Sequence, residues 1–169
     1  MNDTTDFSTC DLCDAQKAGY AEGDGAFRVL PPVFTSYGGR TKFCGPVLTV
    51  KCFEDNSPVK AALESPGQGR VLVVDGGGSL RRALIGGNIA AAAAKNGWAG
   101  VVIDGAARDR AELAAAGVGI RALALVPMPT DRKAPGQTGV PVLIQGIWVR
   151  TGEWLYADED GIVVMPSQA

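Results

Sequence analysis

The chain has 169 residues, of which 46% are hydrophobic and 20% are charged, which suits one domain, residues 1–169, with its own buried core. Its 16 basic and 18 acidic side chains are interspersed and give a net charge of −2, so no basic surface for direct nucleic-acid binding is expected. No apolar run is long enough to cross a membrane and the acidic start lacks the basic segment of a secretory signal, so we expect a cytoplasmic protein without membrane contact.

The first twenty residues are expected to form a tail and a short helix. Residues 1–8 are mostly polar, and we expect them to be a disordered tail. Ser8 and Asp11 are three apart, the S-x-x-D spacing of a helix start. This spacing predicts a helix over residues 10–17 that ends at Gly19.

Extended segments and a second helix are expected next. Residues 29–34 form a proline-interrupted extended stretch, and residues 47–53 are rich in the branched and aromatic side chains typical of a strand. A helix is predicted over residues 55–65, because Pro58 falls in its first turn and Pro66 follows its end.

The middle of the chain alternates strands and helices. Residues 70–75 and 100–104 are continuous apolar runs, which predict strands buried on both faces. Residues 76–78 are three glycines that turn the chain, and residues 89–95 contain five consecutive alanines, which favour a helix lying close on a sheet. A further helix is predicted over residues 108–116.

The last third is expected to consist mainly of strands. We predict a strand over residues 120–126, a polar loop over residues 127–139, a hairpin of residues 140–149 with 154–158, and a final strand over residues 162–165. Strand–helix alternation followed by antiparallel strands predicts a single-domain, mixed α/β fold.

The four cysteines and the lack of histidine narrow the chemistry. Cys10 and Cys13 form a C-x-x-C pair, but Cys44 and Cys52 do not form a second one, and the chain has no histidine. This argues against a four-ligand zinc site, so we interpret the cysteines as small, reduced, buried residues, with the first pair on a helix. A metal would then have oxygen ligands, which favours magnesium or manganese.

The triple glycine does not form a nucleotide site. Gly76–Gly78 follow a predicted strand, but Arg81 stands where G-x-G-x-x-G requires its last glycine. No P-loop motif occurs, and we find no glycine loop suited to an adenosyl cofactor. These glycines are interpreted as a tight turn between packed elements.

The candidate functional residues lie between positions 86 and 112. Gly86, Gly87, Asn88 and Ile89 open a predicted helix, and their free N–H groups would attract an anion. Arg108, which follows the next predicted strand, is suited to binding a carboxylate through two hydrogen bonds. In a parallel sheet both segments would lie at the same edge, where α/β proteins bind ligands.

Asp109 and Glu112 add two acids to this edge. They are three residues apart and would hold a hard cation or its waters, which suits a small keto acid bound with a divalent metal. The spacing by itself favours a structural alternative, because Arg-Asp is common at a helix start. In that alternative Asp109 caps its own helix, and Arg108 forms a surface pair with Glu112.

Several long runs resemble the family of the regulator of ribonuclease activity A. The similarity extends from about residue 9 to residue 166. It is carried by DLCDA at 11–15, GGR at 38–40, TVKCFEDN at 49–56, VVDGGGSLRRAL at 73–84 and YADEDGI at 156–162.

This resemblance implies a fold, an assembly and an activity. The fold would be a three-layer β/β/α sandwich like the swivelling phosphohistidine domain, assembled as a ring-shaped homotrimer with clefts between subunits. The wider family includes 4-hydroxy-4-methyl-2-oxoglutarate aldolases, which also decarboxylate oxaloacetate with magnesium or manganese. By that resemblance Arg108 binds the substrate, Asp109 ligates the metal, and the amides of residues 86–89 hold the substrate. The spacing of Glu112 from Asp109 makes Glu112 a candidate for the second shell of that metal.

The sequence departs from the aldolase signature, an acid followed by twenty residues and Arg-Asp, at one position. The acid falls on Gly87, and the C-terminal extension that supplies an acid to a neighbouring subunit in longer aldolases is not expected after Ala169. Two hypotheses follow: a metal-dependent lyase that releases pyruvate from a small keto acid, and a non-catalytic regulator that inhibits ribonuclease E.

Overall fold

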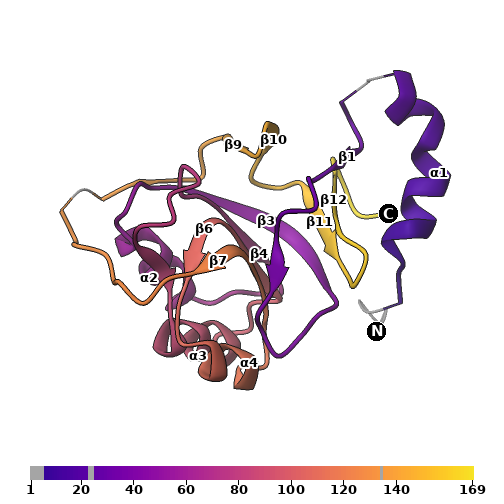
Figure 1. The fold of residues 1–169 in the computed structure, drawn as a ribbon. Helices are drawn as coiled ribbons and strands as arrows, with labels where there is room; N and C mark the ends of the chain where they lie inside the picture. Colours follow the sequence, from indigo (N-terminus) through magenta and orange to yellow (C-terminus); the bar gives the residue numbers. More distant parts are fainter. Residues whose placement is uncertain (1–5, 23–24, 134) are drawn as a thin grey trace.

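The protein is a mixed sheet with helices on one face and further strands on the other (Figure 1). The computed structural model describes residues 6–22, 25–133 and 135–169. The helices within these residues are α1 (Thr9–Glu22), α2 (Ser57–Leu63), α3 (Gly87–Lys95) and α4 (Arg110–Ala115). The strands are β1 (Arg28–Val29), β2 (Thr35–Ser36), β3 (Phe43–Lys51), β4 (Val71–Asp75), β5 (Ala83–Ile85), β6 (Gly100–Ala107), β7 (Gly119–Leu125), β8 (Gln137–Thr138), β9 (Val142–Ile144), β10 (Ile147–Val149), β11 (Trp154–Ala157) and β12 (Ile162–Met165).

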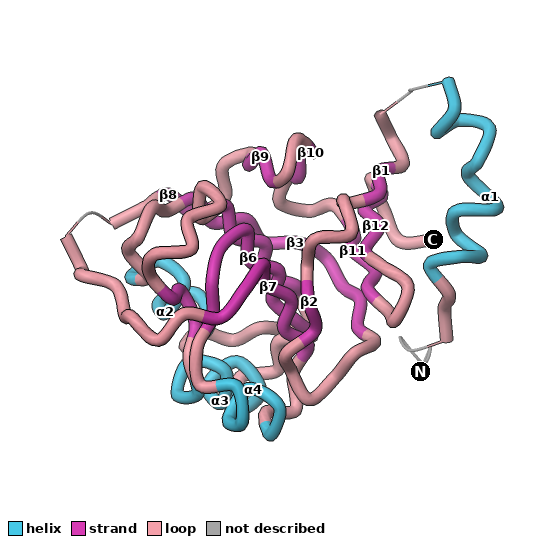
Figure 2. Tube along the Cα trace, in the orientation of Figure 1, coloured by secondary structure: helices cyan, strands magenta, loops and turns pink. Residues whose placement is uncertain are grey.

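The strand order is β1-β12-β11-β3-β4-β6-β7-β2 (Figure 1, Figure 2). In addition, β5 pairs with β6 and β8 pairs with β3. The central strands β3, β4, β6 and β7 are parallel, and Val50, Val74 and Ile103 are aligned across the first three of them. The first half of β3 pairs with β11 in the antiparallel sense. The long β3 therefore joins a parallel half of the sheet to an antiparallel half, as the predicted mixed α/β class requires.

Alternate side chains of β4 enter two separate cores. Leu72 and Val74 pack with the side chains of α2, α3 and α4, whereas Val71 and Val73 pack with those of β9 to β12. All four are completely buried, so the continuous apolar run marks a strand covered on both faces, as predicted. The layers are helices, parallel sheet and a second group of strands. The likeness to the phosphohistidine domain in particular stays a prediction.

The N-terminal helix differs from its prediction in length. α1 continues past Gly19 to Glu22, because one glycine weakens a helix without ending it when the following residues stay helical. Residues 1–5 of the expected tail lie outside the described residues. Phe7, near the end of that tail, packs against Tyr156 with ring centroids 5.1 Å apart.

Two strand predictions were wrong. The hairpin of residues 140–149 with 154–158 does not form, because the chain turns earlier, at Gln145 and Gly146, and pairs β9 with β10. Both turn residues have positive φ, at 48° and 80°, as two-residue hairpins prefer. β11 lies instead between β3 and β12. The strand predicted to end at residue 104 runs on as β6 to Ala107, because β5, which was not predicted, pairs with its end.

Candidate functional site

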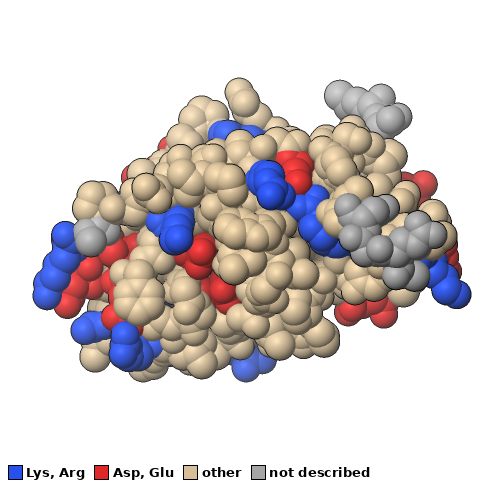
Figure 3. All heavy atoms as spheres, turned by 90° about the horizontal axis from the view of Figure 1, so that it is seen from above, with Lys and Arg blue, Asp and Glu red and all other residues tan. Residues whose placement is uncertain are grey.

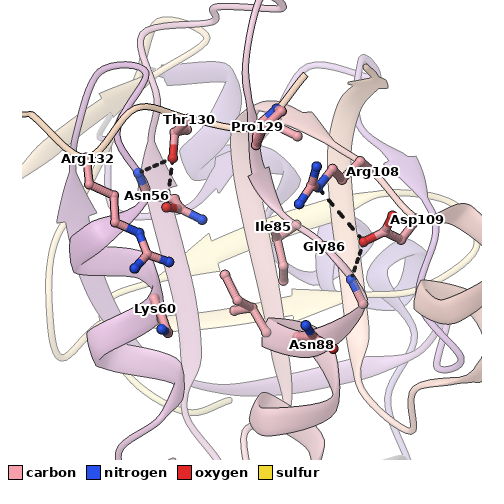
Figure 4. Close-up of a pocket in the computed structure, with 13 residues that line it drawn as sticks. Asn56, Lys60, Ile85, Gly86, Asn88, Arg108, Asp109, Pro129, Thr130 and Arg132 are labelled. Atoms are coloured by element: carbon pink, nitrogen blue, oxygen red, sulfur yellow. Dashed lines mark hydrogen bonds and ion pairs between the residues drawn. The ribbon is translucent and has the colours of Figure 1, made fainter. Parts of the chain in front are cut away.

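A cavity of about 200 Å³ opens at the carboxyl ends of the parallel strands (Figure 4). It is smaller than the pockets of about 300–1,000 Å³ that hold drug-sized ligands, so its size suits a small metabolite. The segments that follow β3, β5, β6 and β7 meet here. The lining residues are Asn56, Lys60, Ala83, Ile85, Gly86, Gly87, Asn88, Ile89, Arg108, Asp109, Pro129, Thr130 and Arg132.

The start of α3 forms one wall of the cavity. Gly86 is extended and provides no side-chain cap, and the first helical hydrogen bond runs from Ala90 N–H to the Gly86 carbonyl. Gly87 N–H donates to Asp109 Oδ2 at 2.9 Å. Among the described residues, no acceptor is found for the N–H groups of Asn88 and Ile89. Two of the predicted amide donors thus remain available to an anion, whereas the Gly87 amide is engaged by the protein itself.

Asp109 points at α3 and not at its own helix. It stands directly before α4 with φ 63° and ψ 53°, a left-handed conformation, and its side chain makes no capping bond to α4. Aspartate tolerates this conformation better than most residues, at some cost in strain. The backbone turn aims the carboxylate at the Gly87 amide, so the structural alternative in which Asp109 caps α4 is not found.

Arg108 makes one hydrogen bond and one ion pair at the cavity edge. Its Nη1 donates to the Pro127 carbonyl at 3.3 Å, and its Nε lies 3.9 Å from Asp109 Oδ2. The side chain is still 40% exposed. The ion pair of Arg108 in the described chain is therefore with Asp109 and not with Glu112, and the guanidinium has further donors for a ligand.

Glu112 lies over the glycine pair that opens α3. A Cβ atom added to Gly87 would overlap the Glu112 carboxylate, and one added to Gly86 would stand 2.6 Å from Asp109 Oδ2. The two glycines therefore allow both carboxylates to lie against the start of α3. Glu112 occupies the space in which the side chain of an acid at position 87 would begin.

These two carboxylates fit a divalent cation that retains most of its waters. No group of three or more His, Cys, Asp or Glu side chains suited to a metal occurs in the described part of the chain, so a closed protein cage is not formed. Magnesium is commonly held by one or two carboxylates together with waters and substrate oxygens. Within the described residues, Asp109 Oδ1 and the Glu112 carboxylate make no hydrogen bond, so they provide hard oxygen donors of this kind.

The opposite wall of the cavity was not predicted. Asn56 directly precedes α2 and Lys60 lies within it, whereas Thr130 and Arg132 lie in the loop after β7 (Figure 4). Both segments follow parallel strands, and ligands bind at the carboxyl ends of such strands, so the reasoning that located Arg108 applies to them as well. The sequence does not show which of the segments after the strands come together in space.

The cysteines lie away from this cavity. Cys44 and Cys52 are buried as expected, and burial together with Asp75 and Asp55 raises the pKa of Cys52 to about 12. Cys10 and Cys13 do lie on a helix, but Cys10 is exposed. The prediction of burial is wrong for Cys10, because α1 packs on the outside of the sheet and leaves one side in solvent.

Charged side chains of both signs lie on the surface. Figure 3 shows one face, on which Lys and Arg side chains are scattered among Asp, Glu and uncharged residues and form no continuous basic area among the residues described. Within residues 6–22, 25–133 and 135–169, no helix combines the length and apolar character needed to cross a bilayer.

A protein-family model described as "RraA-like: Aldolase/RraA" matches residues 9–164. The chain belongs to the RraA-like family. This confirms the resemblance found in the sequence, and the match covers the cavity residues on both walls.

Proteins similar to this chain carry different names. A protein of Albidiferax ferrireducens named "Putative 4-hydroxy-4-methyl-2-oxoglutarate aldolase" is 64% identical, covering 95% of this chain and 96% of the relative. The structure of the RNA-processing inhibitor RraA from Thermus thermophilis is 45% identical with a TM-score of 0.89, covering 97% of this chain and 95% of the other. A structure from Geobacillus kaustophilus described as an S-adenosylmethionine: 2-dimethylmenaquinone methyltransferase is 40% identical with a TM-score of 0.88, covering 96% of each chain. These names describe three different activities.

Proposed function

We propose that this protein is a metal-dependent carbon–carbon lyase that cleaves 4-hydroxy-4-methyl-2-oxoglutarate and also decarboxylates oxaloacetate, releasing pyruvate in both cases. The observation that carries the proposal is the convergence of Arg108, Asp109 and the start of α3 on one small cavity. The aldolase name of the relative that is 64% identical supports it.

The chain's own donors are suited to a 2-oxo acid. The free N–H groups of Asn88 and Ile89 would bind the carboxylate next to the oxo group. Arg108 would donate to that carboxylate and to the oxo oxygen, where negative charge develops as the carbon–carbon bond breaks. A divalent cation bound by Asp109, Mg²⁺ or Mn²⁺, would supply Lewis-acid polarisation of the same oxygen.

The two reactions place different demands on the site. In aldol cleavage the C3–C4 bond breaks, the C4 hydroxyl loses its proton, and the electron pair left on C3 forms an enolate that is then protonated, so two pyruvates result. In decarboxylation the C3–C4 bond of oxaloacetate breaks, CO₂ leaves, and C3 is protonated. Decarboxylation requires no hydroxyl deprotonation, so it depends chiefly on Arg108 and Asp109.

We propose that Glu112 replaces the acid missing at Gly87. Its carboxylate occupies the space beside Gly87 in which that acid would begin. There it would hold waters of the cation, the role expected of an outer-shell carboxylate. The glycine at position 87 is then compatible with catalysis.

Pyruvate release provides the test of the lyase proposal. Pyruvate is measured by coupling to lactate dehydrogenase with Mg²⁺ present, after subtraction of the rate without protein. Wild-type protein should release pyruvate from both acids. Asp109→Ala should lose this activity and the binding of Mn²⁺ measured by electron paramagnetic resonance. Asp131→Ala, which removes an exposed aspartate outside the cavity, should retain both. Equal activity in Asp109→Ala and wild type would end the proposal.

We further propose that the protein acts in the cytoplasm as a homotrimer. Phe53, Leu80 and Met128 are large apolar side chains exposed by 50% or more, and such side chains supply contact surface between subunits. Light scattering of the purified protein should give three times the mass of one chain, 17.4 kDa. A monomer at micromolar concentration would contradict this assembly.

Regulation of ribonuclease E is the second candidate function. It is favoured by the relative described as an RNA-processing inhibitor and by Gly87 in place of the signature acid. The test is whether the purified protein binds ribonuclease E and slows its cleavage of an RNA substrate. Failure of both measurements would remove this candidate and leave the lyase unaffected.

A further inference from the structure

A second cavity, of about 310 Å³, opens at the amino ends of the parallel strands, the edge of the sheet opposite the candidate site. The segments that precede β4, β6 and β7 meet here, and each contributes a glycine to the lining, namely Gly69, Gly97 and Gly117. Because glycine has no side chain, the space between these segments stays unfilled. The second cavity shares no lining residue with the one that contains Arg108 and Asp109.

Two tryptophans contribute aromatic surface to the second cavity. Trp98 is 2% exposed, and its indole Nε1 donates to the Ser65 carbonyl at 3.0 Å. Trp154 is half-buried and stacks on Tyr156, with ring centroids 6.2 Å apart and an interplanar angle of 29°. Both rings are therefore held in place by the protein and provide fixed apolar surface, against which a planar apolar group can pack.

Arg40 is the one charged side chain that lines the second cavity in the described part of the chain. Its backbone N–H donates to the Val118 carbonyl at 3.3 Å, but its exposed guanidinium makes no hydrogen bond or ion pair with any described residue. Gln68, which is also exposed, adds an uncharged amide to the lining. A guanidinium with unused donors and no carboxylate beside it is suited to an anion.

The charge and the apolar surface together restrict the class of ligand. A cation would meet Arg40 and no described acid, and an uncharged apolar molecule would leave the guanidinium unused. The volume is at the lower end of the range for small-molecule sites, which suits a ligand with one ring. The best match is a molecule that joins one carboxylate to one planar apolar ring.

We propose that the second cavity binds an aromatic monocarboxylic acid, with its carboxylate on Arg40 and its ring against Trp98 and Trp154. Arginine can bind a carboxylate through two parallel hydrogen bonds, and the ring gains by leaving water. This inference does not depend on the lyase proposal, because the two cavities lie at opposite edges of the sheet.

The three tryptophans of the chain provide a built-in test of location. The indole N–H signals in a ¹H–¹⁵N correlation spectrum are followed during titration with benzoate at constant ionic strength, and they are assigned with Trp98→Phe and Trp154→Phe. The signals of Trp98 and Trp154 should shift and saturate together. Trp148, which is 48% exposed on β10 and lies outside the cavity, should not shift.

Two further probes separate the charge from the ring. Benzamide has the shape of benzoate without the charge, and wild-type protein should bind benzoate at least about tenfold more tightly, the effect of one charge-assisted hydrogen bond. Acetate has the charge without the ring. It should also bind at least about tenfold more weakly than benzoate, because it buries much less apolar surface.

Variants assign the preference for benzoate over benzamide to Arg40. Arg40→Met should abolish this preference while the affinity for benzamide stays unchanged. Lys95→Met is the matched control, because Lys95 is an exposed cation next to Ala94, a lining residue, but lies outside the cavity. It should keep the wild-type preference. Thermal unfolding checks that each variant is folded.

Four results would overturn the inference. They are equal binding of benzoate and benzamide by wild-type protein, equal binding of acetate and benzoate, a preference that is unchanged in Arg40→Met or lost equally in Lys95→Met, and a shift of Trp148 as large as the other two. The comparison of benzoate, benzamide and acetate uses the wild-type protein alone, so it decides the question even if Arg40→Met does not fold. None of these results bears on pyruvate release, which is measured separately.

Discussion

Replacing Glu112 by Gln tests whether this side chain takes the place of the missing acid. The substitution keeps the shape of the side chain and removes the charge that would hold the waters of a cation. Loss of such an outer-shell partner typically costs about 10–100-fold in metal affinity or activity. We expect the Mg²⁺ concentration for half-maximal pyruvate release to rise by about that factor, with a smaller change in the rate at saturating Mg²⁺.

The geometry also predicts how the acid can be moved back to position 87. A Cβ at position 87 would lie 2.7 Å from Glu112 Cβ and 2.6 Å from its Cδ, so Gly87→Asp alone overpacks the site and should cost about 1–3 kcal/mol of unfolding free energy. At about 2–4 °C per kcal/mol for a chain of this size, Tm should fall by about 2–12 °C. The exchange variant Gly87→Asp/Glu112→Gly removes the overlap and should recover most of the lost Mg²⁺ response. It would still carry the cost of a glycine in α4, about 1 kcal/mol.

The assay is the Mg²⁺ titration of pyruvate release by wild type, Glu112→Gln and the exchange variant, with Tm measured on the same samples. Glu64→Gln, which changes an exposed glutamate at the C-terminal cap of α2, serves as the control. If Glu112→Gln titrated like wild type, the replacement of the signature acid by Glu112 would be refuted. An inactive but folded exchange variant would show that position 87 does not supply an equivalent carboxylate.

Three further predictions concern the fold and Arg108. Thr9→Val removes the 2.6 Å bond from Thr9 Oγ1 to the buried Asp158 carboxylate and should cost about 2 kcal/mol in urea unfolding. Burial would raise the pKa of Asp158, but hydrogen bonds, chiefly from Thr9, hold that pKa below its ordinary value. This stabilisation is present above the ordinary pKa of aspartate. The difference in unfolding free energy between the variant and the wild type should therefore shrink as pH falls through the pKa of folded Asp158. A difference in unfolding free energy that does not depend on pH would contradict this. Gly119→Ala would bring a Cβ 2.6 Å from Phe43 Cγ and should lower the unfolding free energy by about 1–3 kcal/mol, whereas an unchanged Tm would show that the ring has room to move. Arg108→Lys keeps the positive charge but cannot bind a carboxylate through two parallel hydrogen bonds, so kcat/KM for oxaloacetate should fall at least about tenfold at unchanged Tm. An unaltered kcat/KM would show that Arg108 does not bind the substrate.

The fold was predicted best where local sequence and burial agree. The apolar run of β4 and the alanine-rich α3 lie where the sequence places them, because both faces of the strand are covered and the helix packs on it through small side chains. The pairing of β11 was predicted wrongly, since its partner β3 is about a hundred residues earlier in the chain. A strand's own pattern shows that it is buried and does not show which strand lies beside it.

The candidate site was predicted in part for the same reason. Because ligands bind at the carboxyl ends of parallel strands, the sequence predicted that Arg108 and Asp109 lie near the glycine pair that opens α3, and the structure has them there. It did not predict that Asp109 would turn away from α4, because that depends on its left-handed backbone conformation. The opposite wall, with Lys60 and Arg132, comes from α2 and from the loop after β7, which are far apart in the chain.

The sequence alone determined the family, the mixed α/β class and the residues that open α3, because these depend on local runs, glycine positions and spacing. Only the tertiary structure decided that Asp109 faces Gly87, that Glu112 fills the space beside it, and that Lys60 and Arg132 face them across the cavity. Such contacts join segments far apart in the chain, and their geometry is set by how the loops after parallel strands pack together.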